Sequence, residues 1–307
     1  MRGRRAAAKH RIRQHMVAFP RAARNVHVMP ILTGRARLAG IVGWPVAHSR
    51  SPRIHGFWLD RHAIDGAYVP LAVRPEDFVS AVRGLRAAGF AGVNVTIPHK
   101  QAAFALCDAV DDVARRAGAV NTIVFHRDRI EGTNTDGFGF LANLRAEGVD
   151  PAAGPALILG AGGAARAIAA ALLAKGVSVT ISNRTRERAE ALSHDLPGLT
   201  VIDWNARQKA LRDQMLVVNA TSLGMGGTSG SALALDDARL SLVVVDIVYT
   251  PLETELLVAA RARALRTVDG LGMLLHQARW GFAAWFGVQP TVDAELRRFV
   301  LSDLDPA

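Results

Sequence analysis

The stretch Pro155-Ala-Leu-Ile-Leu-Gly160-Ala-Gly162-Gly163-Ala-Ala165-Arg166 decides the fold of this chain. A short apolar segment runs into G-x-G-x-x-A and then into an alanine-rich segment with helical character. In such a turn the first glycine makes the tight bend and the second lets the backbone approach a pyrophosphate, while the small third residue permits close helix–strand packing. The helix N-terminus adds N–H donors and a positive dipole end. Although glycine-rich turns without a ligand are common, the order strand, turn, helix predicts a dinucleotide site here.

Further strands and helices alternate around this turn, as in parallel βαβ construction. We expect strands at residues 156–159, 177–182, 200–203, 216–220 and 243–248, with helices between them. A helix at 138–146 precedes this block. The pattern predicts a Rossmann domain over residues 137–270.

The tip of the second strand of this block indicates which nucleotide binds. An NAD enzyme usually places Asp or Glu there, about 20 residues after the turn, to hold the ribose 2′-hydroxyl. Here the segment is Ser182-Asn-Arg-Thr-Arg-Glu-Arg188, with no carboxylate at the strand tip. Guanidinium groups such as Arg184 can bind a 2′-phosphate, whereas Arg186 and Glu187 are expected to be solvated helix residues. The sequence therefore favours NADP(H) over NAD.

A second alternating block comes first in the chain, and together the two blocks predict an α/β fold. Expected strands are 37–44, 67–73 and 92–97, followed by an antiparallel pair at 120–125 and 129–131. Expected helices are 51–64, capped by Ser51 before an N1 proline, 75–88, and one continuous helix over 100–116. Two last helices, 271–286 and 292–302, are expected to return to this first block because Gly270 breaks the cofactor block just before them. Residues 37–136 with 271–307 then form a substrate-binding and catalytic domain.

Polar clusters follow the strands of the first block, where such a sheet presents ligands. They are His48-Ser-Arg-Ser-Pro52, Asn94-Val-Thr-Ile-Pro-His-Lys100, Ala117-Gly-Ala-Val-Asn-Thr122 and Asn134-Thr-Asp-Gly137. Any one of them could be structural, because serines cap helices and asparagines form turns. Four in one block, just before a dinucleotide turn, are hard to explain as turns alone.

The order and spacing of these motifs, with Asn219-Ala-Thr-Ser222 and Asp269-Gly-Leu-Gly-Met273, resemble the shikimate dehydrogenase family from about residue 38 to the C-terminus. His99 departs from it, standing where an aromatic residue is often found. The resemblance implies a substrate site in which the substrate's carboxylate and hydroxyls are held by Ser49, Ser51, Thr96, Asn121, Asp136 and Gln277. Asn94 and Tyr249 would lie close by. It implies a cofactor site at Asp112, Gly160, Ala161, Gly162, Gly163, Ala164, Asn183, Arg184, Thr185, Arg188, Ile247 and Gly270.

Lys100 and Asp136 are the expected catalytic pair. Reduction of a ketone places negative charge on its oxygen, so a proton donor must lie within hydrogen-bond reach. The ammonium can donate to that oxygen while the carboxylate orients it and binds a neighbouring hydroxyl. Whether Lys100 relays a proton or acts mainly as an electrostatic clamp stays open at this point. It could also be a surface lysine at a helix start, although that end of the helix dipole is unfavourable for a cation.

The function implied is reversible NADPH-linked reduction of 3-dehydroshikimate to shikimate, on the route to chorismate and the aromatic amino acids. A quinate or dual quinate/shikimate dehydrogenase is the nearest alternative, because one or two pocket residues could discriminate these ligands. Ser51, rather than a larger residue, favours shikimate. A non-catalytic dinucleotide-binding regulator is disfavoured because Lys100 and Asp136 are both present.

Composition limits the other possibilities. Nine lysines and arginines and no acid fall within residues 1–36, so the net charge of +10 is almost wholly carried by this segment. It is expected to be a disordered basic tail, with a transit peptide or a translation start at Met29 as alternatives, and nucleic acid is not an expected partner. No apolar run reaches the roughly 18 residues of a membrane span. Cys107, the only cysteine, is expected to be a buried thiol. No metal site is expected. We expect a cytoplasmic monomer or homodimer that acts on a small-molecule substrate.

Overall fold

The computed structural model describes residues 31–227 and 233–302, so most of the basic segment 1–36 lies outside the described residues. From Leu32 onward the chain forms one compact unit. In these described ranges it contains two six-stranded sheets. None of the described helices combines the length and the apolar character that a membrane span requires.

The second sheet carries the glycine-rich turn. Its strands are β7 (Ala156–Leu159), β8 (Val179–Ser182), β9 (Leu199–Ile202), β10 (Leu216–Asn219), β11 (Val243–Asp246) and β12 (Arg266–Val268). Their order is β12-β11-β10-β7-β8-β9, and all neighbours are parallel. This is the doubly wound order, in which ligands bind outside the carboxyl ends of the strands where the order reverses, here between β7 and β10. The Rossmann prediction is confirmed, although β12 was not expected.

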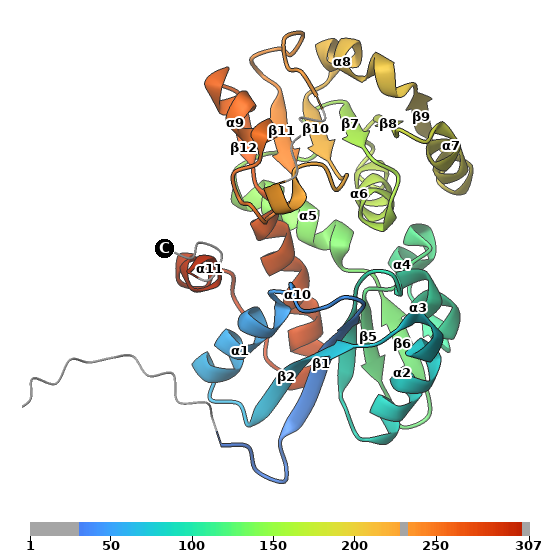
Figure 1. The fold of residues 1–307 in the computed structure, drawn as a ribbon, viewed down its shortest axis with the longest axis vertical. Coiled ribbons are helices and arrows are strands. Elements are labelled where there is room, and N and C mark those ends of the chain that lie inside the picture. Colours follow the sequence, from blue (N-terminus) through green and yellow to red (C-terminus); the bar gives the residue numbers. More distant parts are fainter. Residues whose placement is uncertain (1–30, 228–232, 303–307) are drawn as a thin grey trace, which may run out of the picture. The chain divides into compact units, whose positions relative to one another are not determined.

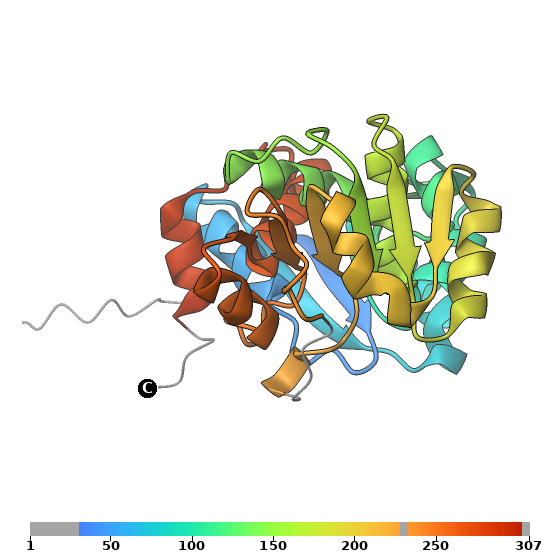
Figure 2. The same cartoon turned by 90° about the horizontal axis from the view of Figure 1, so that it is seen from above.

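Both faces of this sheet are covered, so successive residues of one strand enter different cores. Ile158 packs with residues of α5 (Asp136–Ala146), α6 (Gly163–Leu173) and α7 (Arg186–Asp195). Its neighbour Leu157 packs with residues of α9 (Glu255–Ala262) on the opposite face. Figure 2 shows helices on either side of these strands. The short elements α8 (Arg207–Ala210), η2 (Trp204–Ala206), η3 (Leu211–Asp213) and η4 (Met225–Gly227) fill connections.

The first sheet is mixed. Its strands are β1 (Arg37–Gly43), β2 (Gly66–Ala72), β3 (Gly92–Val95), β4 (Ala109–Val110), β5 (Thr122–Phe125) and β6 (Ile130–Thr133), in the order β2-β1-β3-β5-β6-β4. Strands β1, β2 and β3 are parallel, and β5 and β6 form the expected antiparallel pair. One face packs on α1 (Ser51–Arg61), α10 (Gly270–Phe286) and α11 (Ala294–Leu301). The other packs on α2 (Phe78–Ala87), α3 (Lys100–Leu106) and α4 (Asp112–Ala117), and the exposed η1 (Pro75–Asp77) leads into α2.

The C-terminal helices return to the first sheet, as expected from the break at Gly270 (Figure 1). Helix α10 contacts β1, β3 and β5, and α11 contacts α1. The indole of Trp285 on α10 donates to the carbonyl oxygen of Ile123 on β5 at 3.0 Å. Helix α10 also lies along α5, the helix that leads out of the first sheet. These contacts place side chains of α10 close to the residues that follow β3 and β6.

The prediction of one continuous helix over residues 100–116 is wrong. Helix α3 ends at Leu106, β4 pairs with β6, and α4 begins at Asp112. Two carboxylates cause the break: Asp108 accepts from the backbone N–H of Ile130 at 2.7 Å, and Asp111 caps α4 by accepting from Ala114 N–H at 2.8 Å. Aspartate commonly takes such roles because its short side chain competes for backbone donors.

Cys107 lies at this break and is half-buried rather than fully buried. Burial, together with the charge of the neighbouring Asp108, raises the pKa of its thiol to about 12. The thiol is therefore protonated and unreactive at neutral pH.

Candidate active site

A cavity of about 150 Å³ opens where the polar motifs of the first block converge. It gathers every side chain expected to bind substrate or to act in catalysis, and its lining also includes Ile41, His48, Val95 and Leu274. The expected residues that it brings together are Ser49, Ser51, Asn94, Thr96, Lys100, Asn121, Asp136, Tyr249 and Gln277.

These side chains come from different elements because several elements end at the same edge of the first sheet. Asn94 is on β3, Lys100 is the first residue of α3, and Asp136 is the first residue of α5. Tyr249 follows β11 of the second sheet, and Gln277 lies on α10. The cavity is therefore assembled from both sheets and from the returning helix.

Lys100 and Asp136 form an ion pair, with Lys100 Nζ 2.5 Å from Asp136 Oδ2. The other carboxylate oxygen, Oδ1, accepts from Asn121 Nδ2 at 2.7 Å. The side chains of Lys100 and Asp136 are 19% and 4% exposed, so the pair is largely withdrawn from water. These contacts exclude the alternative that Lys100 is a solvated surface lysine.

Ser51 does not cap α1 as expected. The N-cap residue is Arg50, without a side-chain cap bond, and Ser51 is the first residue of the helix. The backbone N–H of Ser51 donates to Ser49 Oγ at 3.3 Å, and the buried Ser51 side chain lines the cavity instead. The proline at position 52 has no backbone N–H, so the helix starts with one donor fewer for a cap side chain to satisfy.

Gln277 and Tyr249 bring polar groups to the cavity from the far side. The Oε1 atom of Gln277 is buried and has no hydrogen-bond partner among the described residues. A buried acceptor without a partner is unfavourable, and a ligand hydroxyl would satisfy it. Burial raises the pKa of Tyr249, so its hydroxyl stays protonated and can donate.

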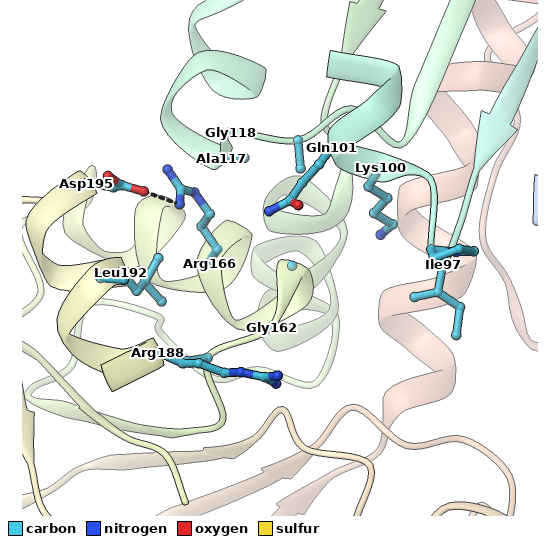
Figure 3. A pocket seen from close by; sticks show the side chains of 15 residues that line it. Ile97, Lys100, Gln101, Ala117, Gly118, Gly162, Arg166, Arg188, Leu192 and Asp195 are labelled. Carbon is cyan, nitrogen blue, oxygen red and sulfur yellow. Dashed lines mark hydrogen bonds and ion pairs between the residues drawn. The ribbon is translucent and has the colours of Figure 1, made fainter. Parts of the chain in front are cut away.

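A second, larger cleft of about 580 Å³ lies beside the glycine-rich turn. Its walls include Ala161, Gly162, Gly163 and Arg188 from the expected cofactor site. Figure 3 shows Arg188 and Lys100 reaching into it from opposite walls. Lys100 lines both this cleft and the smaller cavity, so the two spaces meet at the lysine.

The glycines fit a pyrophosphate. Gly160 has φ +106°, and a Cβ there would lie 2.8 Å from the carbonyl oxygen of Ala220, so a larger residue is excluded. Added Cβ atoms at Gly162 and Gly163 would meet nothing within 4 Å, so the N-terminus of α6 is open to a ligand. Ala164 follows in the first turn of this helix.

The residues at the tip of β8 lie at the surface beyond the lining of this cleft. Arg184 is exposed and has no hydrogen-bond or ion-pair partner in the part of the chain that the structure describes, whereas Asn183 Nδ2 donates to the backbone oxygen of Thr185 at 2.7 Å. Arg186 is paired with Glu190 and Asp203, which agrees with its expected place as a solvated helix residue. Arg184 is therefore the guanidinium available at the strand tip.

Five other expected cofactor residues also lie outside the cleft lining: Gly160, Ala164, Ile247, Gly270 and Asp112. A Cβ on Gly270 would lie 2.3 Å from the carbonyl oxygen of Ile247, so these two are packed together at the end of β11. Asp112 lies elsewhere: its side chain is 78% exposed and pairs with Arg115 at 3.3 Å, outside both cavities.

Sequence reasoning missed Gln101, Arg166 and Asp195, which line the larger cleft. Arg166 Nη1 lies 2.6 Å from Asp195 Oδ2. The sequence did carry a signal for Arg166, because this residue directly follows the glycine-rich motif at the start of α6. Asp195 is brought to it only by the packing of α7, for which the sequence offers no local signal.

Comparison with known proteins identifies the family of the chain. The model of the shikimate dehydrogenase substrate binding domain matches residues 41–123, and that of shikimate / quinate 5-dehydrogenase matches residues 150–269. Shikimate dehydrogenase (NADP(+)) of Acidiphilium cryptum is 66% identical over 274 residues, covering 89% of this chain and 99% of the relative. Shikimate 5-dehydrogenase of Thermus thermophilus, solved in complex with NADP(H) and shikimate, superposes with a TM-score of 0.80 at 38% identity, covering 87% of this chain and 99% of that one. Quinate dehydrogenase of Corynebacterium glutamicum, solved with NAD, gives a TM-score of 0.81 at 31% identity, with coverages of 87% and 99%. The chain belongs to the shikimate dehydrogenase family.

Proposed function

We propose that this chain catalyses the reversible NADPH-linked reduction of 3-dehydroshikimate to shikimate, a step toward chorismate and the aromatic amino acids. The observation that carries the proposal is the cavity that joins the Lys100–Asp136 pair to hydroxyl and amide side chains and opens at Lys100 onto the glycine-rich cleft. The relatives at 66% and 55% identity are named as NADP(+)-dependent shikimate dehydrogenases.

The substrate roles follow from the chemistry of the lining. Hydroxyl groups suit a carboxylate, and amide and hydroxyl groups suit ring hydroxyls. The proposal assigns the substrate's carboxylate and hydroxyls to Ser49, Ser51, Thr96, Asn121, Asp136 and Gln277, with Asn94 and Tyr249 close by.

Lys100 and Asp136 perform the proton chemistry in this proposal. Lys100 Nζ donates a hydrogen bond to the substrate oxygen on which negative charge develops, which stabilises the transition state more than the ground state. Asp136 Oδ2 holds the ammonium in place, and Asn121 holds the carboxylate through Oδ1. A bound nicotinamide cofactor supplies the hydride.

The cofactor in this proposal is NADP(H). The open N-terminus of α6 and the close approach at Gly160 fit the pyrophosphate, and the absence of a carboxylate at the tip of β8 fits a 2′-phosphate held by Arg184 and Arg188. The binding residues proposed are Gly160, Ala161, Gly162, Gly163, Ala164, Asn183, Arg184, Thr185, Arg188, Ile247 and Gly270. The role of Asp112 stays a prediction.

The proposal also assigns a role to each domain of the chain. Residues 37–136 with 271–307 bind substrate and carry the catalytic pair, and residues 137–270 bind the cofactor. We further propose a cytoplasmic monomer or homodimer.

The test is a matrix of two substrates and two cofactors, followed by the absorbance of the reduced nicotinamide. We expect kcat/KM for shikimate with NADP to exceed that for quinate by at least about 10-fold, the scale on which one group in a pocket discriminates. A preference for quinate would overturn the substrate assignment, and a preference for NAD would overturn the cofactor assignment.

A further inference from the structure

A chain of hydrogen bonds leads from Tyr68, which is not part of the cavity lining, to the catalytic carboxylate. Tyr68 Oη, on β2, donates to Asn94 Oδ1 at 2.6 Å, and Asn94 Nδ2 donates to Thr122 Oγ1 at 3.0 Å. Thr122 Oγ1 donates to Asn121 Oδ1 at 2.9 Å, and Asn121 Nδ2 donates to Asp136 Oδ1 at 2.7 Å. Tyr68 and Thr122 are both buried.

The direction of this chain is fixed by backbone groups at two points. Asn94 Nδ2 also donates to the backbone oxygen of Asn121 at 3.2 Å, so the amide oxygen of Asn94 must face Tyr68. Asn121 Oδ1 accepts from the backbone N–H of Thr135 at 2.9 Å, so its amide nitrogen must face Asp136. The hydroxyl of Thr122 lies between a donor and an acceptor and must accept from one and donate to the other.

It follows that Tyr68 must donate to Asn94 and that every link from Tyr68 onward points toward Asp136. Turning either amide over would place two donors or two acceptors against each other inside the protein, which is costly. Hydrogen bonds linked in one direction also polarise one another.

The surroundings of Tyr68 favour this donor role. Burial raises its pKa well above the usual value, and a hydrogen bond with Ser51 opposes the shift only in part, so the hydroxyl keeps its proton. The ring of His55 stacks on it with centroids 3.9 Å apart and planes at 1°. Neither ring nitrogen of His55 has a hydrogen-bond partner among the described residues, and burial lowers its pKa to about 3. His55 is therefore a neutral stacking partner that leaves the hydroxyl of Tyr68 free to donate to Asn94.

The chain of hydrogen bonds determines which polar group of Asn94 faces a ligand. Its two N–H groups are committed to Thr122 and to the backbone oxygen of Asn121. Its oxygen accepts from Tyr68 and keeps a second lone pair. At Asn94 the cavity therefore offers an acceptor, which suits a ring hydroxyl.

We propose that Tyr68 is a positioning residue whose hydroxyl holds the Asn94 amide in place, in the orientation that the backbone oxygen of Asn121 fixes, so that the cavity selects a hydroxyl donor at that point, and that it acts through the chain of hydrogen bonds to Asp136. This inference rests on the proposed function, because it concerns the binding of a polyhydroxylated substrate in that cavity.

The test uses Tyr68→Phe, which removes only the hydroxyl, measured with whichever of shikimate and quinate the wild type oxidises. We expect the KM for this substrate to rise about 10-fold, the factor that one lost hydrogen bond gives, while the KM for NADP stays within about twofold. Thr122→Val breaks the same chain one link further on. The double variant should therefore lose much less than the product of the two single effects.

Trp58→Phe is the matched control. Trp58 belongs to the same aromatic core, and its indole donates to the backbone oxygen of Thr291 at 3.0 Å, outside the chain. This variant should lose thermal stability with both KM values unchanged.

The inference is overturned if Tyr68→Phe leaves the substrate KM within about twofold of the wild type, if both KM values rise together, or if the double variant shows the full product. With an active wild type, these results leave the proposed function standing. A wild type that oxidises neither compound overturns the proposed function and this inference together.

Discussion

Replacing Lys100 with alanine tests the centre of the proposed mechanism. The substitution removes the ammonium whose Nζ lies 2.5 Å from Asp136 Oδ2. The carboxylate, only 4% exposed, keeps Asn121 Nδ2 as a hydrogen-bond donor and loses its counter-charge. The same change also removes the donor placed where the cavity and the glycine-rich cleft meet.

Two magnitudes follow from this geometry. Removing one partner of a buried ion pair costs about 3–5 kcal/mol, and the lower end applies because removing the lysine side chain opens the carboxylate to the cavity that both residues line. Losing a positioned proton donor lowers kcat by roughly 10²–10⁴. KM should change far less, because the lost interaction is stronger in the transition state than in the ground state.

Steady-state kinetics with shikimate and NADP, together with urea unfolding, measure both effects. Lys175→Ala, at an exposed lysine just after α6, is the matched control and should change neither. Asp136→Ala should impair kcat and KM together, and the Lys100/Asp136 double variant should be much less impaired than the product of the single effects.

An intact kcat with a raised KM in Lys100→Ala would reduce the lysine to a substrate-binding role. If both single variants keep the wild-type kcat/KM, the active site lies elsewhere and the reasoning from the ion pair is refuted.

Three further predictions address the cofactor site and the core. Arg184→Ala should weaken NADP binding by about 1.5–3 kcal/mol, the scale of a charge-assisted hydrogen bond, with little effect on NAD; equal losses in a titration with each cofactor would make the arginine structural. Because burial lowers the pKa of His55 from 6.5 to about 3, its contribution to stability is complete above pH 6.5 and declines as the pH falls toward 3. The loss is about 1.4 kcal/mol per pH unit, so His55→Leu should flatten the fall in urea-unfolding free energy between pH 6.5 and about 5, and an unchanged slope would contradict the assignment. Gly270→Ala would place a Cβ 2.3 Å from the carbonyl oxygen of Ile247, so it should cost about 1–3 kcal/mol in stability and raise the KM for NADP. Gly84→Ala, at a helical glycine with open space around it, should instead stabilise by about 0.5–1 kcal/mol, and equal effects at the two glycines would show that the close contact is not the cause.

The sequence by itself determined the parts of this protein that depend on neighbouring residues. The tight bend at Gly160, with φ +106°, requires glycine whatever surrounds it, and alternating apolar strands and helices require a parallel sheet covered on both faces. The motifs at the strand ends, among them those with Lys100 and Asp136, also predicted the reaction before any distance was known, through their resemblance to the shikimate dehydrogenase family.

Only the tertiary structure decided the features whose partners lie far apart in the chain. The helix expected over residues 100–116 breaks because Asp108 bonds to the backbone of Ile130, 22 residues away. The hydroxyl of Ser51 turns from capping a helix to lining a cavity. The amide of Asn94 takes its orientation from the backbone oxygen of Asn121, 27 residues after it, and is held there by Tyr68, 26 residues before it. Local rules predict that such polar side chains cap helices or form turns, because the backbone groups of neighbouring residues are always close to them. A buried hydrogen bond to a distant strand outweighs them only after folding has excluded water and left one arrangement in which every donor meets an acceptor.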